Sequence, residues 1–304
     1  MESYDIIIVG AGPAGLTAGI YTGRQGSKSL ILEKTIAGGL GLEIPSMGNY
    51  PGFELISGMI LMSKMKQQAQ KFLEIKENES AENIIKVENG FEITTTKTKY
   101  FAKAIILTMG RKHRKIGVTG EEKFLGLGVS YCATCDGIFY KDKKTIVIGG
   151  GNSSLQEAIF LDNLGVDVTI VHRREEFRAE HYLQEKIKNK NIKIIPSSNI
   201  KEIKGDKFVK SVILEDKKGN QREIKTDGVF VAIGSLPSSI ELTKNLNIKL
   251  DDANQIVTDK KQETSMLFVY SAGDITGGLQ QLVVACGEGA IAATSAYNDL
   301  ENIK

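Results

Sequence analysis

The strongest chemical signal in the sequence is a pair of cysteines, Cys132 and Cys135, which are separated by two residues and followed directly by Asp136. Cysteines at this spacing form a redox-active disulfide or bind zinc. Zinc would need two further ligands, and the rest of the chain offers only Cys286 and three scattered histidines. We therefore predict a redox disulfide and no metal site. Cys286 lies in an apolar helical pattern, and we expect it to be a buried structural thiol.

Asp136 is a polar side chain next to the sulfur pair. Opening and forming a disulfide moves protons, and a nearby carboxyl group can supply or accept one. Asp136 is therefore a candidate acid, and a solvated turn residue is the plainer interpretation.

A strand, a glycine turn, a helix and a second strand are predicted twice, 139 residues apart and without a gap. In such a βαβ unit the glycines let the backbone approach a pyrophosphate, and the helix N-terminus supplies its dipole. The sequence therefore predicts two dinucleotide sites, with a tight strand-to-helix connection as the plainer alternative for each turn. The matched positions are Gly10 with Gly149, Gly12 with Gly151, and Glu33 with His172.

The two copies differ at the end of the second strand. A carboxylate there hydrogen-bonds a free ribose 2′-hydroxyl, so Glu33 fits a dinucleotide that has no 2′-phosphate. The second copy has His172, Arg173 and Arg174 instead, with Arg178 close behind. Guanidinium groups bind phosphate oxygens through charge-assisted hydrogen bonds. The second copy therefore predicts NADPH, unless the arginines form a solvated run paired with the two glutamates that follow them.

Glycine spacing alone leaves FAD and NAD open for the first copy. A nicotinamide delivers a hydride, whereas a disulfide is opened most readily by an electron-rich centre, so a flavin is the natural mediator between the two. We therefore predict FAD in the first copy. Gly273 and Asp274 follow a further predicted strand, and Asp274 would reach the ribityl chain of the flavin. An ordinary turn aspartate is the alternative.

These elements indicate an α/β fold with two domains, since 304 residues exceed what one hydrophobic core usually organises. Each βαβ unit begins a Rossmann-like nucleotide-binding domain of three layers (ββα/βαβ). The stretch after residue 240 contains no glycine turn of this kind, so we expect the second domain to be inserted into the first. The expected bounds are 1–112 and 237–304 for the two parts of the FAD-binding domain, and 113–236 for the NADPH-binding domain that carries the cysteine pair.

Further elements are expected around the two copies. Residues 90–103 alternate as a small antiparallel piece would, and residues 104–109 form a separate buried strand. The segments 193–212 and 222–233 are expected to close the second sheet. A helix of small residues is expected from about residue 280 to residue 296.

The composition argues against several functions. The 39 basic and 37 acidic residues nearly cancel, and no basic block interleaved with aromatic residues marks a nucleic-acid surface. No apolar run approaches the roughly 18 residues that a membrane span requires. The chain starts almost directly in a predicted strand, and its three cysteines suit a redox pair in a reducing compartment. We therefore expect a cytoplasmic protein that binds neither nucleic acid nor membrane.

Several motifs along the whole chain resemble the low-molecular-weight thioredoxin reductases of the pyridine nucleotide-disulfide oxidoreductase family. They lie at residues 10–15, 38–39, 49–52, 130–137, 149–151, 172–178, 232–234 and 272–274. The resemblance implies a homodimer, an FAD domain split around an inserted NADPH domain, and thioredoxin as electron acceptor. It also implies that Cys135 lies near the flavin, that Cys132 exchanges with thioredoxin, and that Asp136 is the acid.

The predicted cofactor contacts form two sets. Those toward FAD are Gly10, Gly12, Pro13, Ala14, Gly15, Glu33, Lys34, Gly38, Gly39, Leu40, Asn49, Gly273, Asp274, Gln280 and Gln281. Those toward NADPH are Gly149, Gly151, Asn152, Ser153, His172, Arg173, Arg174 and Arg178. Three of these positions depart from the family pattern, because Leu40 stands where glutamine is frequent, Gln280 where arginine is common, and Asn152 where the family has aspartate.

The cysteine pair and the NADPH site share the inserted domain, yet both must reach one flavin. We hypothesise that this domain rotates on two chain crossings, near residues 110–117 and 232–239. The expected function is electron transfer from NADPH through FAD and the disulfide to thioredoxin. The alternatives are a flavin-dependent redox sensor and a disulfide reductase with another acceptor, either the partner of a peroxidase system or a ferredoxin-linked enzyme.

Overall fold

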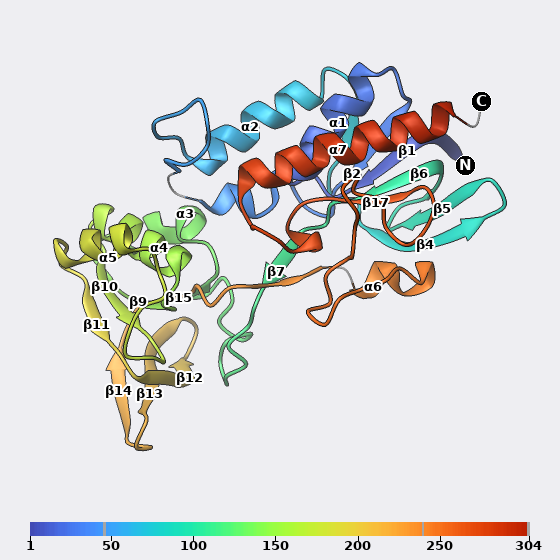
Figure 1. The fold of residues 1–304 in the computed structure, drawn as a ribbon. Helices are drawn as coiled ribbons and strands as arrows, with labels where there is room; N and C mark the ends of the chain where they lie inside the picture. Colours follow the sequence, from blue (N-terminus) through green and yellow to red (C-terminus); the bar gives the residue numbers. More distant parts are fainter. Residues whose placement is uncertain (45–46, 239, 303–304) are drawn as a thin grey trace. The chain divides into compact units, whose positions relative to one another are not determined.

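The structure, a computed structural model, describes residues 1–44, 47–238 and 240–302. The chain divides into two compact units, which Figure 1 traces by colour along the sequence. The first unit, here called the outer unit, comprises residues 1–112 and 237–304, and the inserted unit comprises residues 113–236. Each unit has its own sheet and its own hydrophobic core.

The outer unit is built on a parallel sheet that continues into an antiparallel extension. The strand order is β3-β2-β1-β6-β5-β4, and β17 also pairs with β6. β6 joins the parallel part of the sheet to the antiparallel part, because it runs parallel to β1 and β17 but antiparallel to β5. The strands are β1 (Glu2–Val9), β2 (Ser29–Leu32), β3 (Glu74–Lys76), β4 (Ala81–Val87), β5 (Gly90–Thr95), β6 (Lys99–Leu107) and β17 (Val269–Ser271).

Alternation along β1 explains the layers of this unit. Ile6 and Ile8 point into a core shared with α1 (Pro13–Arg24), α2 (Gly58–Ala69) and α7 (Leu282–Glu301). Ile7 and Val9 point into the opposite core, with side chains of β4, β5 and the segment 246–256. Because the residues that point to either face are apolar, β1 is buried on both sides and must be a central strand. In Figure 1, α1 and α7 run side by side over the sheet.

The inserted unit repeats this plan. Its parallel sheet has the order β11-β10-β9-β15-β8, with helices on one face and the antiparallel sheet β12-β13-β14 on the other. The strands of the parallel sheet are β8 (Val129–Ser130), β9 (Lys144–Ile148), β10 (Asp167–Val171), β11 (Lys193–Ile195) and β15 (Gly228–Val231). The other elements are α3 (Ala133–Asp136), α4 (Asn152–Asn163), α5 (His181–Lys188), β12 (Ser198–Gly205), β13 (Val209–Asp216) and β14 (Gln221–Lys225).

The chain passes between the units at two short strands, β7 (Arg111–His113) and β16 (Ser235–Pro237), which pair with each other as a two-stranded sheet. Short helical turns complete the chain. They are η1 (Gly39–Glu43), η2 (Gly137–Tyr140), α6 (Ile240–Thr243), η3 (Lys244–Leu246) and η4 (Asp274–Thr276).

The structure confirms the predicted α/β fold and corrects details of it. Of the segments expected to close the second sheet, β11 and β15 do pair in it, whereas β12, β13 and β14 form a separate sheet. The expected separate strand at 104–109 is the second half of β6, and the last helix, α7, continues to Glu301. Among the described residues, no helix has the length and apolar character that crossing a bilayer demands.

The close contact between α1 and α7 yields a stability prediction. Gly289 of α7 packs against α1, where an added Cβ would lie 2.2 Å from the carbonyl oxygen of Ala14. Gly289→Ala must push the helices apart, and we expect it to lower the free energy of unfolding by about 1–3 kcal/mol. Gly287→Ala is the matched control, since an added Cβ there meets nothing within 4 Å and alanine favours the helix. Thermal unfolding of both variants checks this, and equal stabilities would contradict the packing.

Candidate active site

The glycine turn of the outer unit brings the end of β1 close to the start of α1. Gly10 has a φ of +104°, and an added Cβ would lie 2.5 Å from the carbonyl oxygen of Thr108, which follows the neighbouring strand β6. A Cβ at Gly15 would lie 1.9 Å from the carbonyl oxygen of Gly10, whereas one at Gly12 meets nothing within 4 Å. The turn is therefore closely packed at Gly10 and Gly15, whereas the space at Gly12, just before α1 begins with Pro13, is open. An open space at a helix N-terminus fits a pyrophosphate.

Glu33 follows β2 directly, and its carboxylate is held in place by the turn. One carboxylate oxygen accepts the N–H of Ala11 at 2.8 Å, and the other accepts the N–H of Thr35 at 2.9 Å and its hydroxyl at 3.2 Å. A carboxylate oxygen has two lone pairs, so the oxygen that accepts only the N–H of Ala11 can accept a further hydrogen bond from a ribose hydroxyl. The site therefore fits the adenosine end of a dinucleotide without a 2′-phosphate.

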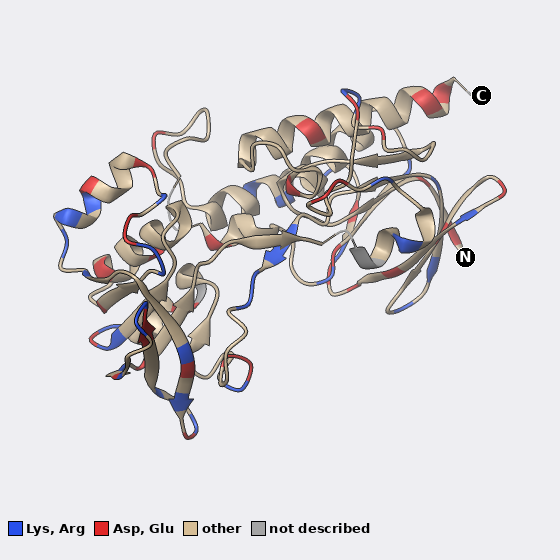
Figure 2. Ribbon diagram, turned by 60° about the horizontal axis from the view of Figure 1, so that its bottom comes forward, with Lys and Arg blue, Asp and Glu red and all other residues tan. Residues whose placement is uncertain are grey.

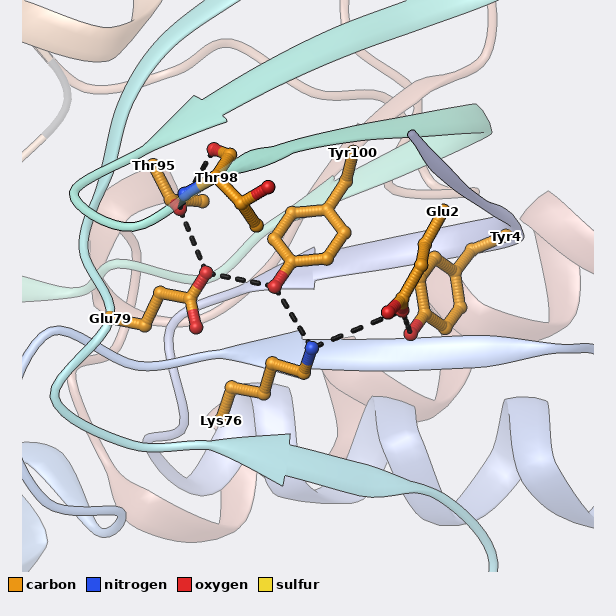
Figure 3. Close-up of polar contacts among 7 residues, drawn as sticks. All are labelled: Glu2, Tyr4, Lys76, Glu79, Thr95, Thr98 and Tyr100. Atoms are coloured by element: carbon orange, nitrogen blue, oxygen red, sulfur yellow. Dashed lines mark hydrogen bonds and ion pairs between the residues drawn. The ribbon is translucent and has the colours of Figure 1, made fainter.

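Two residues that hydrogen-bond the backbone of Glu33 belong to a polar network of Lys76, Glu79 and Tyr100, which Figure 3 shows. The N–H of Glu33 donates to the carbonyl of Lys76, and its carbonyl accepts the N–H of Glu79, both at 2.9 Å. The side chains of these two residues meet at Tyr100, whose hydroxyl accepts from Lys76 Nζ and donates to Glu79, both at 2.9 Å. Burial raises the pKa of Tyr100, so the phenol remains a donor. Sequence reasoning missed this network, which joins β3, β6 and the turn before β4.

The segment from Gly38 to Leu40 lies against the same glycine turn. The N–H of Gly38 donates to the carbonyl of Ala11 at 2.8 Å, and an added Cβ at Gly39 would lie 3.3 Å from Gly12 Cα. Leu40 is half-buried in η1, and Lys34 is exposed beyond Glu33. The structure thus brings the predicted Gly38-Gly39 pair next to Gly12.

Gly273 and Asp274 reach the start of α1 from the end of β17. An added Cβ at Gly273 would lie 3.0 Å from the Cβ of Ala14, and the N–H of Gly273 donates to Glu288 at 2.7 Å. Burial raises the pKa of the Asp274 carboxyl, and the positive charge of Arg111 opposes this rise. Glu288 and Arg111 were not predicted from the sequence, because they come from distant segments with no motif of their own.

Asn49, Gln280 and Gln281 lie at the N-terminus of α7. The amide of Asn49 donates to the side-chain oxygen of Gln281 at 2.9 Å, while Gln280 is exposed. Nearby, Cys286 is a free thiol, 3.8 Å from the Tyr50 hydroxyl oxygen. Cys286 is only partly buried, so the expectation of a buried thiol is wrong. The side chain packs against the core, and its Sγ lies 4.0 Å from the carbonyl oxygen of Pro13 at the start of α1.

The glycine turn of the inserted unit has the same design. Gly149 has a φ of +149°, and an added Cβ would lie 2.2 Å from the carbonyl oxygen of Ala232. A Cβ at Gly151 meets nothing within 4 Å, so the space before α4 is open. Ser153 is exposed in the first turn of α4. This second cradle also fits a pyrophosphate at a helix N-terminus.

His172 lies at the base of the loop that carries Arg173, Arg174 and Arg178, here called the arginine loop, and its side chain is buried rather than exposed. Its ring is 5% exposed and is stacked on Phe177 with 5.4 Å between ring centroids. Burial lowers the pKa of His172, which makes the ring neutral, and Nε2 donates to the carbonyl of Glu176 at 3.0 Å. A Cβ at Gly150 would lie 2.2 Å from this ring. The imidazole therefore fills the space between the second glycine turn and the arginine loop.

The three arginines of this loop are exposed at the end of β10. Arg173, Arg174 and Arg178 make no ion pair with any described residue, so the pairing with the following glutamates, which was the alternative to an NADPH site, is absent there. The N–H of Arg178 donates to the carbonyl of Gly150 at 2.8 Å, which holds the loop against the glycine turn. Asn152 closes the loop by exchanging two hydrogen bonds of 2.8 Å with Glu180. Three uncompensated guanidiniums beside this cradle fit a 2′-phosphate.

Cys132 is disulfide-bonded and 8% exposed. It follows β8, where its N–H donates to the Ser130 hydroxyl at 3.0 Å, and its carbonyl accepts the N–H of Asp136 at 3.2 Å across α3. The Cys135 side chain lies outside the described residues. Asp136 is partly exposed at the end of α3. Among the described residues, no cluster of three or more metal-ligating side chains occurs.

Charge is distributed evenly over the molecule. Figure 2 shows lysine and arginine interspersed with aspartate and glutamate on both units. The arginine loop is thus a local feature of the second cradle rather than part of a basic face.

Known proteins resemble the chain over its whole length. The family described as pyridine nucleotide-disulphide oxidoreductase matches residues 4–289. The thioredoxin reductase of Bacillus subtilis is 39% identical over 312 residues, which cover 99% of this chain and 96% of the relative. The crystal structure of T. acidophilum thioredoxin reductase superposes with a TM-score of 0.93 at 39% identity, covering 99% of this chain and 100% of the other. The Lactococcus lactis thioredoxin reductase in its FR conformation gives 0.92 at 36% identity, covering 98% and 99%.

Two glycine cradles of opposite local charge, a disulfide at Cys132 and similarity over the full length all point the same way, and the chain belongs to the pyridine nucleotide-disulphide oxidoreductase family.

Proposed function

We propose that the chain is an NADPH-dependent FAD flavoprotein that reduces the disulfide of thioredoxin. The observation that carries the proposal is the presence of a disulfide at Cys132 in the unit whose glycine turn adjoins the loop of Arg173, Arg174 and Arg178. FAD and NADPH are the cofactors of this family. When bound, FAD supplies a centre that accepts two electrons as a hydride and passes them to a disulfide. The relatives' name supports thioredoxin as the acceptor.

In the proposed reaction the cysteine pair accepts two electrons and passes both to the acceptor disulfide. One hydride and one proton convert the Cys132 disulfide into two thiols. A thiolate then attacks the acceptor disulfide, and the second cysteine of the pair resolves the mixed disulfide, which restores the starting disulfide and releases a dithiol acceptor. We assign the attack to Cys132 and the resolving step to Cys135. Asp136, one residue beyond the pair, is the candidate that protonates the leaving thiolate.

The surface beside the disulfide suits a protein acceptor. Ile138 and Phe139 follow α3 in η2, and they are 57% and 68% exposed. Two adjacent exposed apolar side chains are unusual on a surface that only meets water, and apolar anchors dominate protein recognition. This supports a protein with a reachable disulfide rather than a small disulfide as the partner.

We propose that the inserted unit rotates between half-reactions. The FAD cradle belongs to the outer unit, whereas the NADPH cradle and the disulfide both belong to the inserted unit. The nicotinamide and the disulfide cannot both contact one flavin ring at the same time, so they must contact it in turn. The two crossings β7 and β16 are the segments about which such a motion would occur.

We also infer a cytoplasmic homodimer. The redox pair suits a reducing compartment. Met59 and Ile60 on α2 and Leu55 before it are 49%, 54% and 70% exposed, and a second copy would bury such an apolar group. A solution mass of 33.2 kDa, that of one chain, would contradict the dimer.

Two other functions would use the same two dinucleotide sites and the same disulfide. A flavin-dependent sensor would be reduced by NADPH only slowly and would pass no electrons to thioredoxin. A ferredoxin-linked reductase would not need three uncompensated arginines at the second cradle, so the arginine loop favours NADPH.

The arginine loop yields a specificity prediction. Arg173→Ala and Arg178→Ala should each raise the KM for NADPH on the order of tenfold, because each removes charge-assisted bonds of ~1.5–3 kcal/mol to the 2′-phosphate. The KM for NADH, which lacks that phosphate, should change less than about twofold. Arg222→Ala is the control, since Arg222 is exposed on β14 in the same unit. Equal losses with both nucleotides would show a structural role instead.

The cysteine pair yields a second prediction. Cys132→Ser and Cys135→Ser should both abolish thioredoxin turnover and still allow NADPH to bleach the flavin absorbance, because the hydride step precedes the disulfide step. Only Cys132→Ser should show a long-wavelength absorbance band, since it leaves Cys135 as a thiolate beside the oxidised flavin. Cys286→Ser, which removes the free thiol, should keep full turnover. A band in Cys135→Ser alone would reverse the two assignments, and turnover by either variant would exclude the pair.

A further inference from the structure

Glu121 of the inserted unit is a buried carboxylate that the reaction does not use. It is 2% exposed, and it accepts three hydrogen bonds. One oxygen accepts the N–H of Ile116 at 2.8 Å and the hydroxyl of Tyr131 at 2.6 Å, and the other accepts the N–H of Gly117 at 2.7 Å. A buried carboxylate is costly unless it is bonded in this way, so its position is tightly determined.

The loop that carries Glu121 is fixed to the inserted unit. The N–H of Glu121 donates to the carbonyl of Val118, and the buried ring of Phe124 lies in the core with β12 and β13. The carbonyl of Thr119 accepts the N–H of Ile203 on β12 at 2.9 Å. Glu121 is therefore a fixed point of this unit.

Two of the bonds to Glu121 come from the first chain crossing. β7 ends at His113, and the N–H of Arg114 donates to the carbonyl of Gly234 beside the second crossing at 2.9 Å. Ile116 and Gly117 follow at once, where Glu121 accepts their backbone N–H groups. Glu121 therefore attaches the end of the first crossing to the inserted unit.

The third bond comes from Tyr131, the residue before Cys132. The Tyr131 ring is stacked on His113, with 5.3 Å between centroids and 20° between planes. Burial and the Glu121 carboxylate raise the pKa of the phenol well above its usual range, so the hydroxyl remains a donor. Tyr131 thus touches the crossing through its ring and Glu121 through its hydroxyl.

We propose that Tyr131 is a positioning residue for the redox disulfide, which it holds in a fixed place relative to the first crossing through Glu121 and His113. The inference rests on the proposed function, because it assumes that the disulfide must be presented to a flavin. A rotation about the crossings brings the disulfide to a defined place only if the crossing and Cys132 move as one body. Misplacement of reacting groups by about 1 Å can cost a hundredfold in rate.

The hydroxyl of Tyr131 can be removed without disturbing the rest. Tyr131→Phe keeps the ring, its stacking on His113 and the two backbone bonds to Glu121. Tyr182→Phe is the matched control, because Tyr182 is 63% exposed on α5 of the same unit. The experiment measures two rates in the FAD-loaded protein after mixing with NADPH. These are the bleaching of the flavin, and the appearance of thiols trapped with an alkylating reagent and counted by mass spectrometry.

Flavin bleaching should be unchanged in Tyr131→Phe, and thiol formation should slow on the order of tenfold. In the apoprotein, hydrogen exchange of the 130–136 backbone should be faster than in wild type and in Tyr182→Phe. Unchanged thiol formation and exchange would overturn the proposal. A parallel fall of both rates together with the melting temperature would overturn it too, since it would show a structural role. Failure of the wild type to form thiols would instead refute the proposed function.

Discussion

The proposed function imposes one constraint on this molecule: two groups of the inserted unit must reach a single cofactor bound by the outer unit. The outer unit carries the cradle with Glu33, and the inserted unit carries both the cradle beside the arginine loop and Cys132. The chain passes between the units only at β7 and β16. The polar contacts described above hold each group within its own unit, and we propose that motion at the crossings selects which group acts.

Each unit fixes its groups with buried polar contacts behind the site. In the outer unit, Lys76 and Glu79 hold the backbone of Glu33 and are joined through Tyr100. In the inserted unit, the neutral ring of His172 supports the arginine loop, and Glu121 joins the crossing to the residue before Cys132. Such contacts cost free energy unless fully hydrogen-bonded, and once bonded they allow little freedom of position.

The sequence predicted what depends on local pattern. The repeat at 139 residues identified the two βαβ units, because glycine turns and apolar strands carry periodic signals. It could not predict that β12, β13 and β14 form a separate sheet, since strand partners depend on contacts distant in sequence. It also missed Glu288, Tyr100 and Glu121 for that reason. The roles of Arg173, Arg178 and Asp136 stay predictions, although their positions beside the second cradle and the disulfide now have a structural basis.

The alternation of the two groups over one flavin is most directly tested by preventing motion between the units. A bifunctional lysine reagent would join them, and mass spectrometry would identify chains in which a peptide from 113–236 is linked to one from 1–112 or 237–304. Chains linked only within a unit are the control. We predict that inter-unit linkage abolishes multiple turnover of NADPH with thioredoxin, while at most one half-reaction survives as a single event. Full multiple turnover by the linked chains would contradict the account.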